Sequence, residues 1–227
     1  MHNWFLLPYL CISQIRKIMC VIAINLGKEI PFHKFQSMWM VNQDGIGMMY
    51  IDGNKKICVE NALVSNTKEL KMFYDVVYLP IWEDKTNTNI VIHFRYATDG
   101  DINYDNIHPF LFTTNHGTYA LMHNGVMPDK YRNYSVSDKY ITSDTQNFVT
   151  GFLQGSDMDF DSYDIKKIIE EIGMNKLVIL SPENMFIVNG QLFKNGSDLD
   201  GNFYSNLNWE FGSRHFYKDK QYQFWKN

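Results

Sequence analysis

The chain has 227 residues, of which 45% are hydrophobic and 15% aromatic, and its formal net charge at pH 7 is −4. This length and this apolar content predict one domain with a large core, and they exclude a chain that is disordered throughout. The acidic balance, with no block of like charges, argues against nucleic acid or an anionic membrane surface as a direct partner.

The cysteines and the apolar segments restrict the class of protein further. Cys11, Cys20 and Cys58 are too few and too scattered for a disulfide framework, and no CxxC pair offers a zinc site. No segment approaches the roughly 20 apolar residues that span a bilayer. The apolar run near the N-terminus is followed by Arg16 and Lys17, whereas a secretory signal carries its basic residues ahead of that run. We therefore expect a cytoplasmic protein with no metal, no cofactor and no membrane partner.

A strand followed by a helix opens the predicted fold. Residues 20–26, CVIAINL, form an apolar and partly β-branched run that predicts a strand. Residues 30–43 carry bulky side chains at helical spacing, with Pro31 in the first turn of the predicted helix. A hairpin follows, because two apolar runs flank the turn residues Gly53 and Asn54.

A second helix and an alternating strand come next. Residues 67–77 have apolar positions three and four apart, which predicts a helix with Thr67 as its N-cap. Residues 88–97 alternate, so they predict a strand with two different faces. His93 and Arg95 lie on the same face of that strand.

The C-terminal half predicts further strands and two more helices. Residues 117–125 predict a strand that ends in a turn, and residues 143–153 open with helix-capping residues. Residues 161–173 predict an amphipathic helix closed by Gly173, and residues 176–196 predict consecutive short antiparallel strands. Because the strands come in hairpins with a few helices between them, the predicted class is α+β with antiparallel sheets.

Three polar groups each have a structural and a functional interpretation. Arg95 is either a paired structural charge or a clamp whose planar fork holds both oxygens of a carboxylate. Asn124 and Gly125 form either an ordinary turn or two N–H donors that face a developing oxyanion. Asp144, in the Ser-Asp-Thr run at 143–145, either caps a helix or receives the ammonium of an amino acid.

Cys20 also has two interpretations. Cysteine is among the most buried residue types, so a core strand can carry one inertly. Its position directly after Met19 suggests instead that Cys20 becomes a chain terminus, through a start at Met19 or through processing. An α-amine with a pKa of about 7.7 to 8.0 would accept the thiol proton, whereas an amide nitrogen inside a chain cannot.

The motifs taken together resemble a known family. They are the Met-Cys pair at 19–20, HFRYATDG at 93–100, NIHPF at 106–110, MHNG at 122–125 and SDT at 143–145. In this order they resemble the glutaminase domain of the class II glutamine amidotransferases, which are N-terminal-nucleophile hydrolases. The resemblance is greatest to the amidophosphoribosyltransferase and glucosamine-phosphate synthase branches.

The resemblance implies a fold and a domain organisation. The family fold is a four-layer αββα sandwich, in which two antiparallel sheets stack face to face and helices cover each side. The resemblance extends from Cys20 to about Lys194, and it implies an amidotransferase domain over residues 20–212. Residues 1–19 are then a leader, a propeptide or a mis-assigned start, and residues 213–227 form a C-terminal tail.

The resemblance implies three catalytic residues. Cys20 would attack the side-chain amide of glutamine, and its own freed α-amine would serve as the base. Asn124 and the N–H of Gly125 would form the oxyanion hole.

The resemblance also implies five substrate-binding residues. Arg95 would hold the α-carboxylate of glutamine and Asp144 its α-ammonium. Tyr96 and Thr98 would belong to a loop that closes on the substrate, and His108 would line the same pocket.

This sequence departs from the family pattern in three places. Asp99 stands where many sugar-phosphate synthases have histidine, and the DGIG run at 44–47 is a reduced version of the family's Arg-Gly-x-Asp-Ser-x-Gly turn. The first eighteen residues have no counterpart in relatives that begin at Met-Cys, although some relatives carry a cleaved propeptide. If this segment is translated and kept, we expect the site to be nearly inactive.

The implied roles predict an enzyme that hydrolyses L-glutamine to glutamate and ammonia and passes the ammonia to a separate acceptor or synthetase subunit. One alternative is a hydrolase of other γ-glutamyl amides or peptides with no synthetase partner. The other is a catalytically silent glutaminase fold that acts as a binding module because its cysteine stays blocked.

Overall fold

The structure, a computed structural model, describes these parts of the chain: 19–132, 135–137, 140–196 and 198–210. The predicted tail over residues 213–227 and all but the last residue of the predicted leader over residues 1–19 lie outside the described residues. Within the described parts, no helix is both long enough and apolar enough to cross a bilayer.

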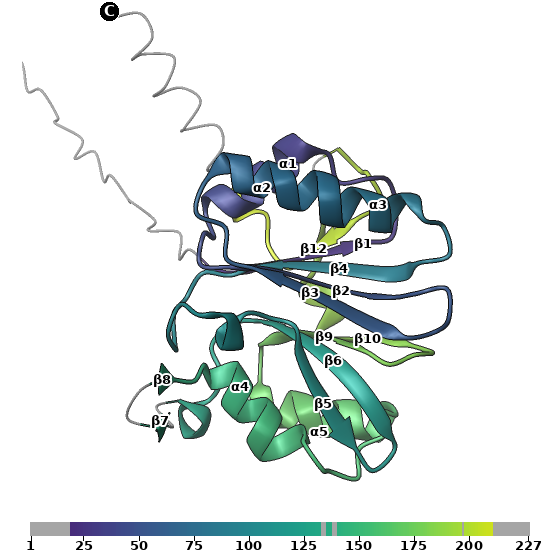
Figure 1. Ribbon diagram of the computed structural model, residues 1–227. Helices are drawn as coiled ribbons and strands as arrows, with labels where there is room; N and C mark the ends of the chain where they lie inside the picture. The colour runs from purple at the N-terminus through teal and green to yellow at the C-terminus, as the bar shows by residue number, and fades with distance from the viewer. Residues whose placement is uncertain (1–18, 133–134, 138–139, 197, 211–227) are drawn as a thin grey trace, which may run out of the picture.

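The described elements form four layers (Figure 1). Helices cover the outer face of a first sheet, a second sheet packs on its inner face, and further helices cover the second sheet from outside. The first helical layer contains α1 (Phe32–Met40), α2 (Thr67–Phe73), the π-helical turn η1 (Tyr74–Tyr78) and α3 (Leu79–Glu83). The second contains α4 (Asp144–Phe148), the π-helical turn η4 (Val149–Leu153) and α5 (Ser162–Ile172). This arrangement confirms the expected αββα sandwich.

Both sheets are antiparallel, as expected. Within the described residues, the first sheet has the strand order β11-β12-β1-β4-β2-β3 and the second has the order β10-β9-β6-β5. The strands of the first sheet are β1 (Val21–Asn25), β2 (Ile46–Ile51), β3 (Ile57–Ala62), β4 (Thr88–Phe94), β11 (Lys194–Asn195) and β12 (Phe203–Tyr204). The strands of the second are β5 (Phe110–Thr114), β6 (Gly117–Asn124), β9 (Lys176–Leu180) and β10 (Met185–Val188). The remaining short elements are η2 (Tyr104–Asn106), η3 (Asp129–Tyr131), β7 (Ser135–Ser137), β8 (Tyr140–Ile141) and η5 (Gly190–Leu192).

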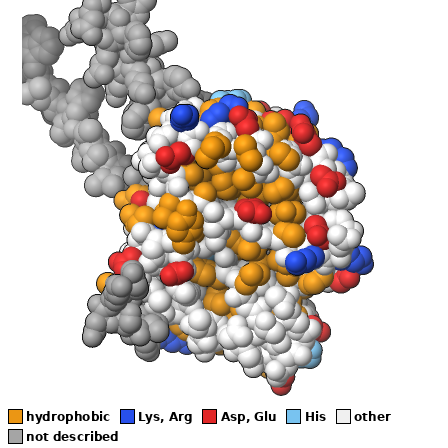
Figure 2. Space-filling model, viewed as in Figure 1, with side chains coloured by type: hydrophobic (Ala, Val, Ile, Leu, Met, Phe, Trp, Pro, Cys, Tyr) orange, Lys and Arg blue, Asp and Glu red, His pale blue; other side chains and the backbone are white. Residues whose placement is uncertain are grey.

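Apolar cores fill the spaces between the layers. Because side chains alternate along a strand, one strand contributes residues to two of these cores. In β1, Val21 belongs to the core under the first helical layer, whereas Ile22 belongs to the core between the sheets. In β6, Leu121 packs toward the second helical layer, whereas Met122 packs between the sheets. Side chains two apart share a face and neighbours face opposite ways, so both faces of each central strand are apolar. The surface seen in Figure 2 mixes acidic and basic side chains, and neither sign forms a large patch on that face.

The two helices in the first half of the chain are capped by other residues than predicted. The cap of α2 is Asn66, whose side chain accepts the backbone N–H of Glu69 at 3.0 Å, and Thr67 lies inside the helix. Asn is a better N-cap than Thr, and it is one residue earlier in the chain. Pro31 is likewise the N-cap residue of α1 and does not lie in its first turn.

The ends of three strands and the start of one helix meet at one place. Because β1 pairs with β4 in antiparallel register, Cys20 just before β1 lies beside Arg95 just after β4. Asn124 ends β6 in the other sheet, and Asp144 begins α4. The fold thus brings together residues that are far apart in the sequence.

Candidate active site

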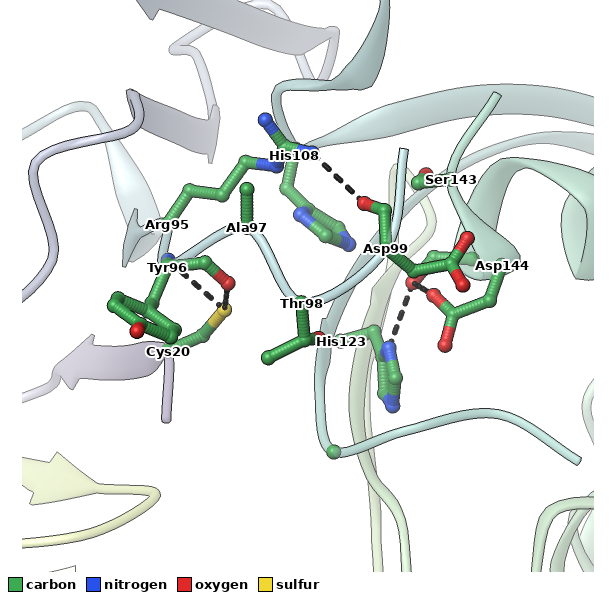
Figure 3. A pocket seen from close by; sticks show the side chains of 12 residues that line it. Cys20, Arg95, Tyr96, Ala97, Thr98, Asp99, His108, His123, Ser143 and Asp144 are labelled. Atoms are coloured by element: carbon green, nitrogen blue, oxygen red, sulfur yellow. Dashed lines mark hydrogen bonds between the residues drawn. The ribbon is translucent and has the colours of Figure 1, made fainter. Parts of the chain in front are cut away.

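One pocket contains the predicted site residues, with the exception of Asn124 (Figure 3). The pocket encloses about 20 Å³, which is room for about one water-sized molecule. It is lined by Cys20, Arg95, Tyr96, Ala97, Thr98, Asp99, His108, His123, Gly125, Ser143, Asp144 and Thr145.

Cys20 is half-buried at one side of this pocket. Its thiol donates to the carbonyl of Tyr96 at 3.3 Å, and the N–H of Tyr96 donates to the sulfur at 3.2 Å. Burial raises the pKa of the Cys20 thiol to about 11, although the Tyr96 hydrogen bond and the positive charge of Arg95 act in the opposite direction. The thiol is therefore protonated at neutral pH unless a base takes its proton.

Arg95 is buried, and its guanidinium bonds to the loop that follows it. Its Nη1 atom donates to the carbonyl of Asp101 at 3.0 Å, and its Nη2 atom donates to the carbonyls of Asp99 at 3.1 Å and Gly100 at 3.4 Å. Figure 3 shows the side chain turned toward this loop. These contacts use at most three of the five guanidinium N–H groups, and a carboxylate ligand that binds through Nη2 would compete with the carbonyls of Asp99 and Gly100.

The Asn124-Gly125 turn reaches the site from the second sheet. The side-chain amide of Asn124 donates to the backbone carbonyl of Cys20, which also accepts the amide of Asn206 at 2.8 Å. The Asn124 side chain therefore contacts the backbone of Cys20, the predicted nucleophile, but it does not line the pocket. Gly125 does line it, and it has a φ of +153°. A Cβ atom there would lie 1.7 Å from Oδ1 of Asn175, so only glycine fits.

Asp144 is fixed at the first turn of α4. Ser143 caps this helix by accepting the N–H of Gln146 at 3.2 Å, as the sequence predicts. One oxygen of the buried Asp144 carboxylate, Oδ2, accepts the N–H of Met127 at 2.8 Å. The other oxygen, Oδ1, lies 3.1 Å from the hydroxyl of Thr145.

The remaining predicted residues lie around the mouth and the floor of the pocket. Tyr96 and Thr98 are exposed at its rim. His108 is buried, and its ring centroid lies 4.2 Å from that of His93. Burial and the neighbouring histidines lower the pKa of His108 well below its usual value, so its ring is neutral at neutral pH.

The DGIG run at 44–47 contacts the loop after β4 and also the backbone of His108. A side-chain oxygen of Asp44 accepts the N–H of Ala97 at 2.7 Å. A Cβ atom on Gly47 would lie 1.5 Å from the carbonyl oxygen of His108, so this strand allows the close approach only because it carries glycine there.

Sequence reasoning did not assign roles to three residues near Asp144. His123 Nδ1 lies 2.7 Å from the hydroxyl of Thr145, and His123 Nε2 lies 2.9 Å from Oδ1 of Asn175. His123 and Thr145 stand inside the MHNG and SDT motifs, so their positions were a usable signal. Asn175 lies outside every motif, in the connection between α5 and β9.

Among the described residues, no group of three or more possible ligand side chains is arranged to hold a metal ion.

The family is decided by a sequence match. The sequence model of the class II glutamine amidotransferases matches residues 32–146, which is just over half of the chain. This chain belongs to the class II glutamine amidotransferases. The match includes Arg95, Asn124, Gly125 and Asp144, and it begins after Cys20.

Solved structures show which fold this class II amidotransferase resembles. An allosteric regulatory enzyme of purine biosynthesis is 19% identical, with a TM-score of 0.50, over 82% of this chain and 41% of that chain. Glutamine phosphoribosylpyrophosphate amidotransferase from B. subtilis is 18% identical, with a TM-score of 0.48, over the same shares. The amidotransferase chain thus spans less than half the length of these proteins, and no curated protein matches it.

Proposed function

We propose that this chain hydrolyses the side-chain amide of L-glutamine to glutamate and ammonia, through a γ-glutamyl thioester on Cys20. The observation that carries the proposal is the convergence of a thiol, a guanidinium and a carboxylate on one pocket, contributed by Cys20, Arg95 and Asp144. Membership of the class II amidotransferases supports the same chemistry.

The proposed nucleophile requires a free α-amine on Cys20. Among the described residues, the thiol donates only to the Tyr96 carbonyl, which cannot take its proton away. We propose that the active form begins at Cys20, after translation from Met19 or removal of the preceding segment. The amine would then accept the thiol proton directly or through water, as in other nucleophiles activated by a terminal amine.

The proposed reaction proceeds in two halves. The thiolate attacks the amide carbon, and the carbonyl oxygen becomes an oxyanion that accepts the Gly125 N–H and the Asn124 amide. The protonated amine then gives its proton to the leaving nitrogen, so ammonia departs and the thioester remains. Water attacks the thioester, the C–S bond breaks, and glutamate and the thiol are released. For the first step, the Asn124 amide must turn from the Cys20 carbonyl toward the substrate.

Substrate binding in this proposal requires the loop after β4 to open. Arg95 now bonds to the carbonyls of residues 99–101, which occupy part of the fork that would hold a carboxylate. We propose that the segment from Thr98 to Asp101 moves outward while Tyr96 keeps its contacts with the Cys20 sulfur, after which Arg95 binds the α-carboxylate and Asp144 binds the α-ammonium. Thr98 and His108 would contact the bound substrate. A loop that closed over the bound substrate would favour free glutamine over a longer γ-glutamyl peptide.

The ammonia would be used by a separate acceptor or synthetase. The solved structures that the chain resembles extend well beyond the matched region, so an acceptor domain or subunit is an expected partner of this domain. We further propose that the protein works in the cytoplasm, because its scattered cysteines suit a reducing compartment.

The decisive experiment compares two cysteine variants of the purified protein. Cys20→Ala should abolish glutamate release from glutamine, whereas Cys58→Ala, a half-buried cysteine on β3, should retain it. Intact-mass measurement of the active protein should show a chain that begins at Cys20. Glutamate release by the Cys20→Ala variant would remove this residue as the nucleophile, and an active chain that retains Met1 would refute the terminal-amine mechanism.

A further inference from the structure

A chain of hydrogen-bonding groups connects Asn175 to Asp144 through the pocket wall. Nε2 of His123 lies 2.9 Å from Oδ1 of Asn175, and Nδ1 of His123 lies 2.7 Å from the hydroxyl of Thr145. The same hydroxyl lies 3.1 Å from Oδ1 of Asp144. Figure 3 shows His123 and Asp144 beside each other in the pocket. The number of protons that these four groups carry determines which of the contacts can form at the same time.

Asn175 determines which nitrogen of His123 carries a proton. The Asn175 amide nitrogen donates to two backbone carbonyls, that of Val126 at 2.9 Å and that of Ile172 at 2.7 Å. Carbonyls only accept, so the Asn175 amide orientation is fixed and its Oδ1 faces His123. Because Oδ1 also only accepts, Nε2 of His123 must donate.

The neutral form of His123 then requires a proton from Thr145. Burial lowers the pKa of His123, although the charge of Asp144 and the Asn175 hydrogen bond oppose that effect. In the neutral ring with a proton on Nε2, Nδ1 can only accept. The single hydroxyl proton of Thr145 therefore goes to His123, the closer of its two neighbours, and is not available to Asp144 Oδ1.

We propose that His123 is a positioning residue, which holds the Thr145 hydroxyl proton away from Asp144 and so keeps Oδ1 of Asp144 available to the ammonium of a substrate. This inference rests on the proposed function, in which Asp144 binds the α-ammonium of glutamine. The other carboxylate oxygen is already bonded to the Met127 N–H. Because Oδ2 already accepts one N–H, Oδ1 has the larger remaining capacity to accept from a ligand.

Protonation of His123 would reverse the direction of these bonds. Both ring nitrogens would then donate, so Thr145 would accept from Nδ1 and give its own proton to Asp144 Oδ1. The substrate ammonium would compete with that hydroxyl, and binding would weaken as the pH falls.

The groups around His123 support a neutral ring at neutral pH. Those facing it are Asp144 on α4, Lys176 on β9, His93 on β4 and His108 in the segment before β5. Burial lowers the pKa of His93 and of His108, so both are uncharged there. Asp144 favours the imidazolium and Lys176 disfavours it, and Arg95 acts on the other two histidines.

The first test removes the His123 nitrogen that accepts the Thr145 proton, and then also removes the Thr145 hydroxyl. In His123→Phe, the Thr145 hydroxyl should turn to Asp144 and raise the KM for glutamine about fivefold to tenfold, the effect of one competing hydrogen bond, with much less effect on kcat. Adding Thr145→Val should bring KM back toward the wild-type value. His116→Phe, at an exposed histidine in the β5–β6 turn, is the matched control. An unchanged KM in His123→Phe, or a double variant with the same KM as the single one, would overturn the proposal.

A second test avoids variants of His123, in case the phenylalanine variant does not fold. For the wild-type protein and for Thr145→Ser, KM should rise as the pH is lowered toward 5, whereas Thr145→Val should lose this rise. The same measurement with a substrate that lacks the α-amino group should show no such difference between variants. A Thr145→Val variant with the full acid rise would contradict the proposal.

The third test separates this inference from the proposed function. NMR of the 15N-labelled full chain should show His123 neutral at pH 7.5 with its proton on Nε2. A proton on Nδ1 would overturn the positioning role even in an active enzyme. The expected tautomer in a protein that binds neither glutamine nor glutamate would instead overturn the proposed function, and with it the ligand assigned to Asp144.

Discussion

The sulfur of Cys20 is held between the backbone N–H and the backbone carbonyl of Tyr96, at 3.2 and 3.3 Å. These two contacts connect the start of β1 to the segment after β4, and they fix the thiol against the pocket. They also place it where burial raises its pKa to about 11. The fold therefore sets the position of the Cys20 sulfur, but it does not make the thiol reactive, because it raises the thiol pKa.

The reactivity of Cys20 toward an alkylating agent should depend on the state of the chain. With the N-terminal segment attached, alkylation should be slow at pH 8 and should accelerate as the pH rises toward about 11, because only the thiolate reacts. A chain that begins at Cys20 should react at least about tenfold faster at pH 8, since the amine lowers the thiol pKa. Rates are measured by mass spectrometry in a Cys11→Ala, Cys58→Ala background. Equal rates in the two chains would count against the amine as base.

Arg95→Lys should mainly weaken substrate binding. A lysine offers a point charge in place of a planar fork, so KM for glutamine should rise about tenfold to hundredfold while kcat falls much less. The control is a glutamine derivative without the α-carboxylate, for which the variant and the wild type should have similar KM values. A lysine variant with wild-type KM and kcat would show that Arg95 does not bind the carboxylate.

Gly125→Ala should damage both stability and catalysis. The new Cβ would lie 1.7 Å from Oδ1 of Asn175 and 3.0 Å from Nε2 of His123, so it would break their hydrogen bond. We expect the free energy of unfolding to fall by about 2 kcal/mol or more and kcat to fall about a hundredfold. Gly117→Ala, at a φ of +159°, has the same kind of backbone strain, and its Cβ would meet only the Tyr119 ring at 3.9 Å, so it should lose less stability and no activity. Urea unfolding and steady-state kinetics test both variants, and equal behaviour of the two would contradict the contact argument.

The buried histidines should make the protein less stable in mild acid. Burial lowers the pKa of His93 to about 3, and it lowers the pKa of His108 in the same direction. A histidine with a lowered pKa in the folded state binds its proton more readily when unfolded. Its contribution to stability is therefore complete above the unfolded pKa near 6.5 and is lost as the pH falls toward the folded pKa.

The size of this acid effect can be measured by urea unfolding between pH 7.5 and pH 5. Each histidine that stays neutral in the folded state should remove about 1.4 kcal/mol per pH unit below 6.5. His108→Phe should reduce the slope, whereas His116→Phe, which changes an exposed histidine, should leave it unchanged. A slope that is identical in all three proteins would show that His108 titrates normally.

The helix cap at Asn66 gives a simple test of the corrected boundary. Asn66→Ala should lower the free energy of unfolding by about 1 kcal/mol, because the N–H of Glu69 loses its acceptor. Thr67→Ala, which changes the residue predicted to be the cap, should have a smaller effect. The reverse order, measured by urea unfolding, would restore the cap to Thr67.

Strand alternation, which is a local property, was sufficient to predict antiparallel strands with two different faces, whereas the four layers were predicted only from the resemblance to the family. The pattern over residues 88–97 places Ile92 and His93 on opposite faces, and the structure has Ile92 in the core under the helices while His93 faces the other sheet. The same pattern did not reveal where the second helix ends. That helix continues past residue 77 to Glu83, because a π-helical turn precedes Pro80 and Pro80 stands at the start of α3, where its missing N–H is least costly.

The site could be predicted only as far as its motifs reach. Cys20, Arg95 and Asp144 became candidates because each lies in a short recognisable run, and the fold brings these three candidates to one pocket. The role of Asn175 was not predictable, since its contact with His123 depends on how the α5–β9 connection folds against the second sheet. Nor does any local pattern reveal that Arg95 bonds to the carbonyls of its own loop.

The site is divided between the two sheets, since Cys20 and Arg95 stand at the ends of strands in one and Asn124 at the end of a strand in the other. The apolar layer that includes Ile22 and Met122 packs between these two halves, and the bond from Asn124 to the Cys20 carbonyl also connects them. A small shift of one sheet over the other would separate the Cys20 thiol from the Asn124-Gly125 turn without unfolding either sheet. Heating, or a substitution that leaves a cavity in this apolar layer, should therefore abolish glutamine hydrolysis. The loss should occur at temperatures where the far-UV circular dichroism spectrum is still that of the native protein.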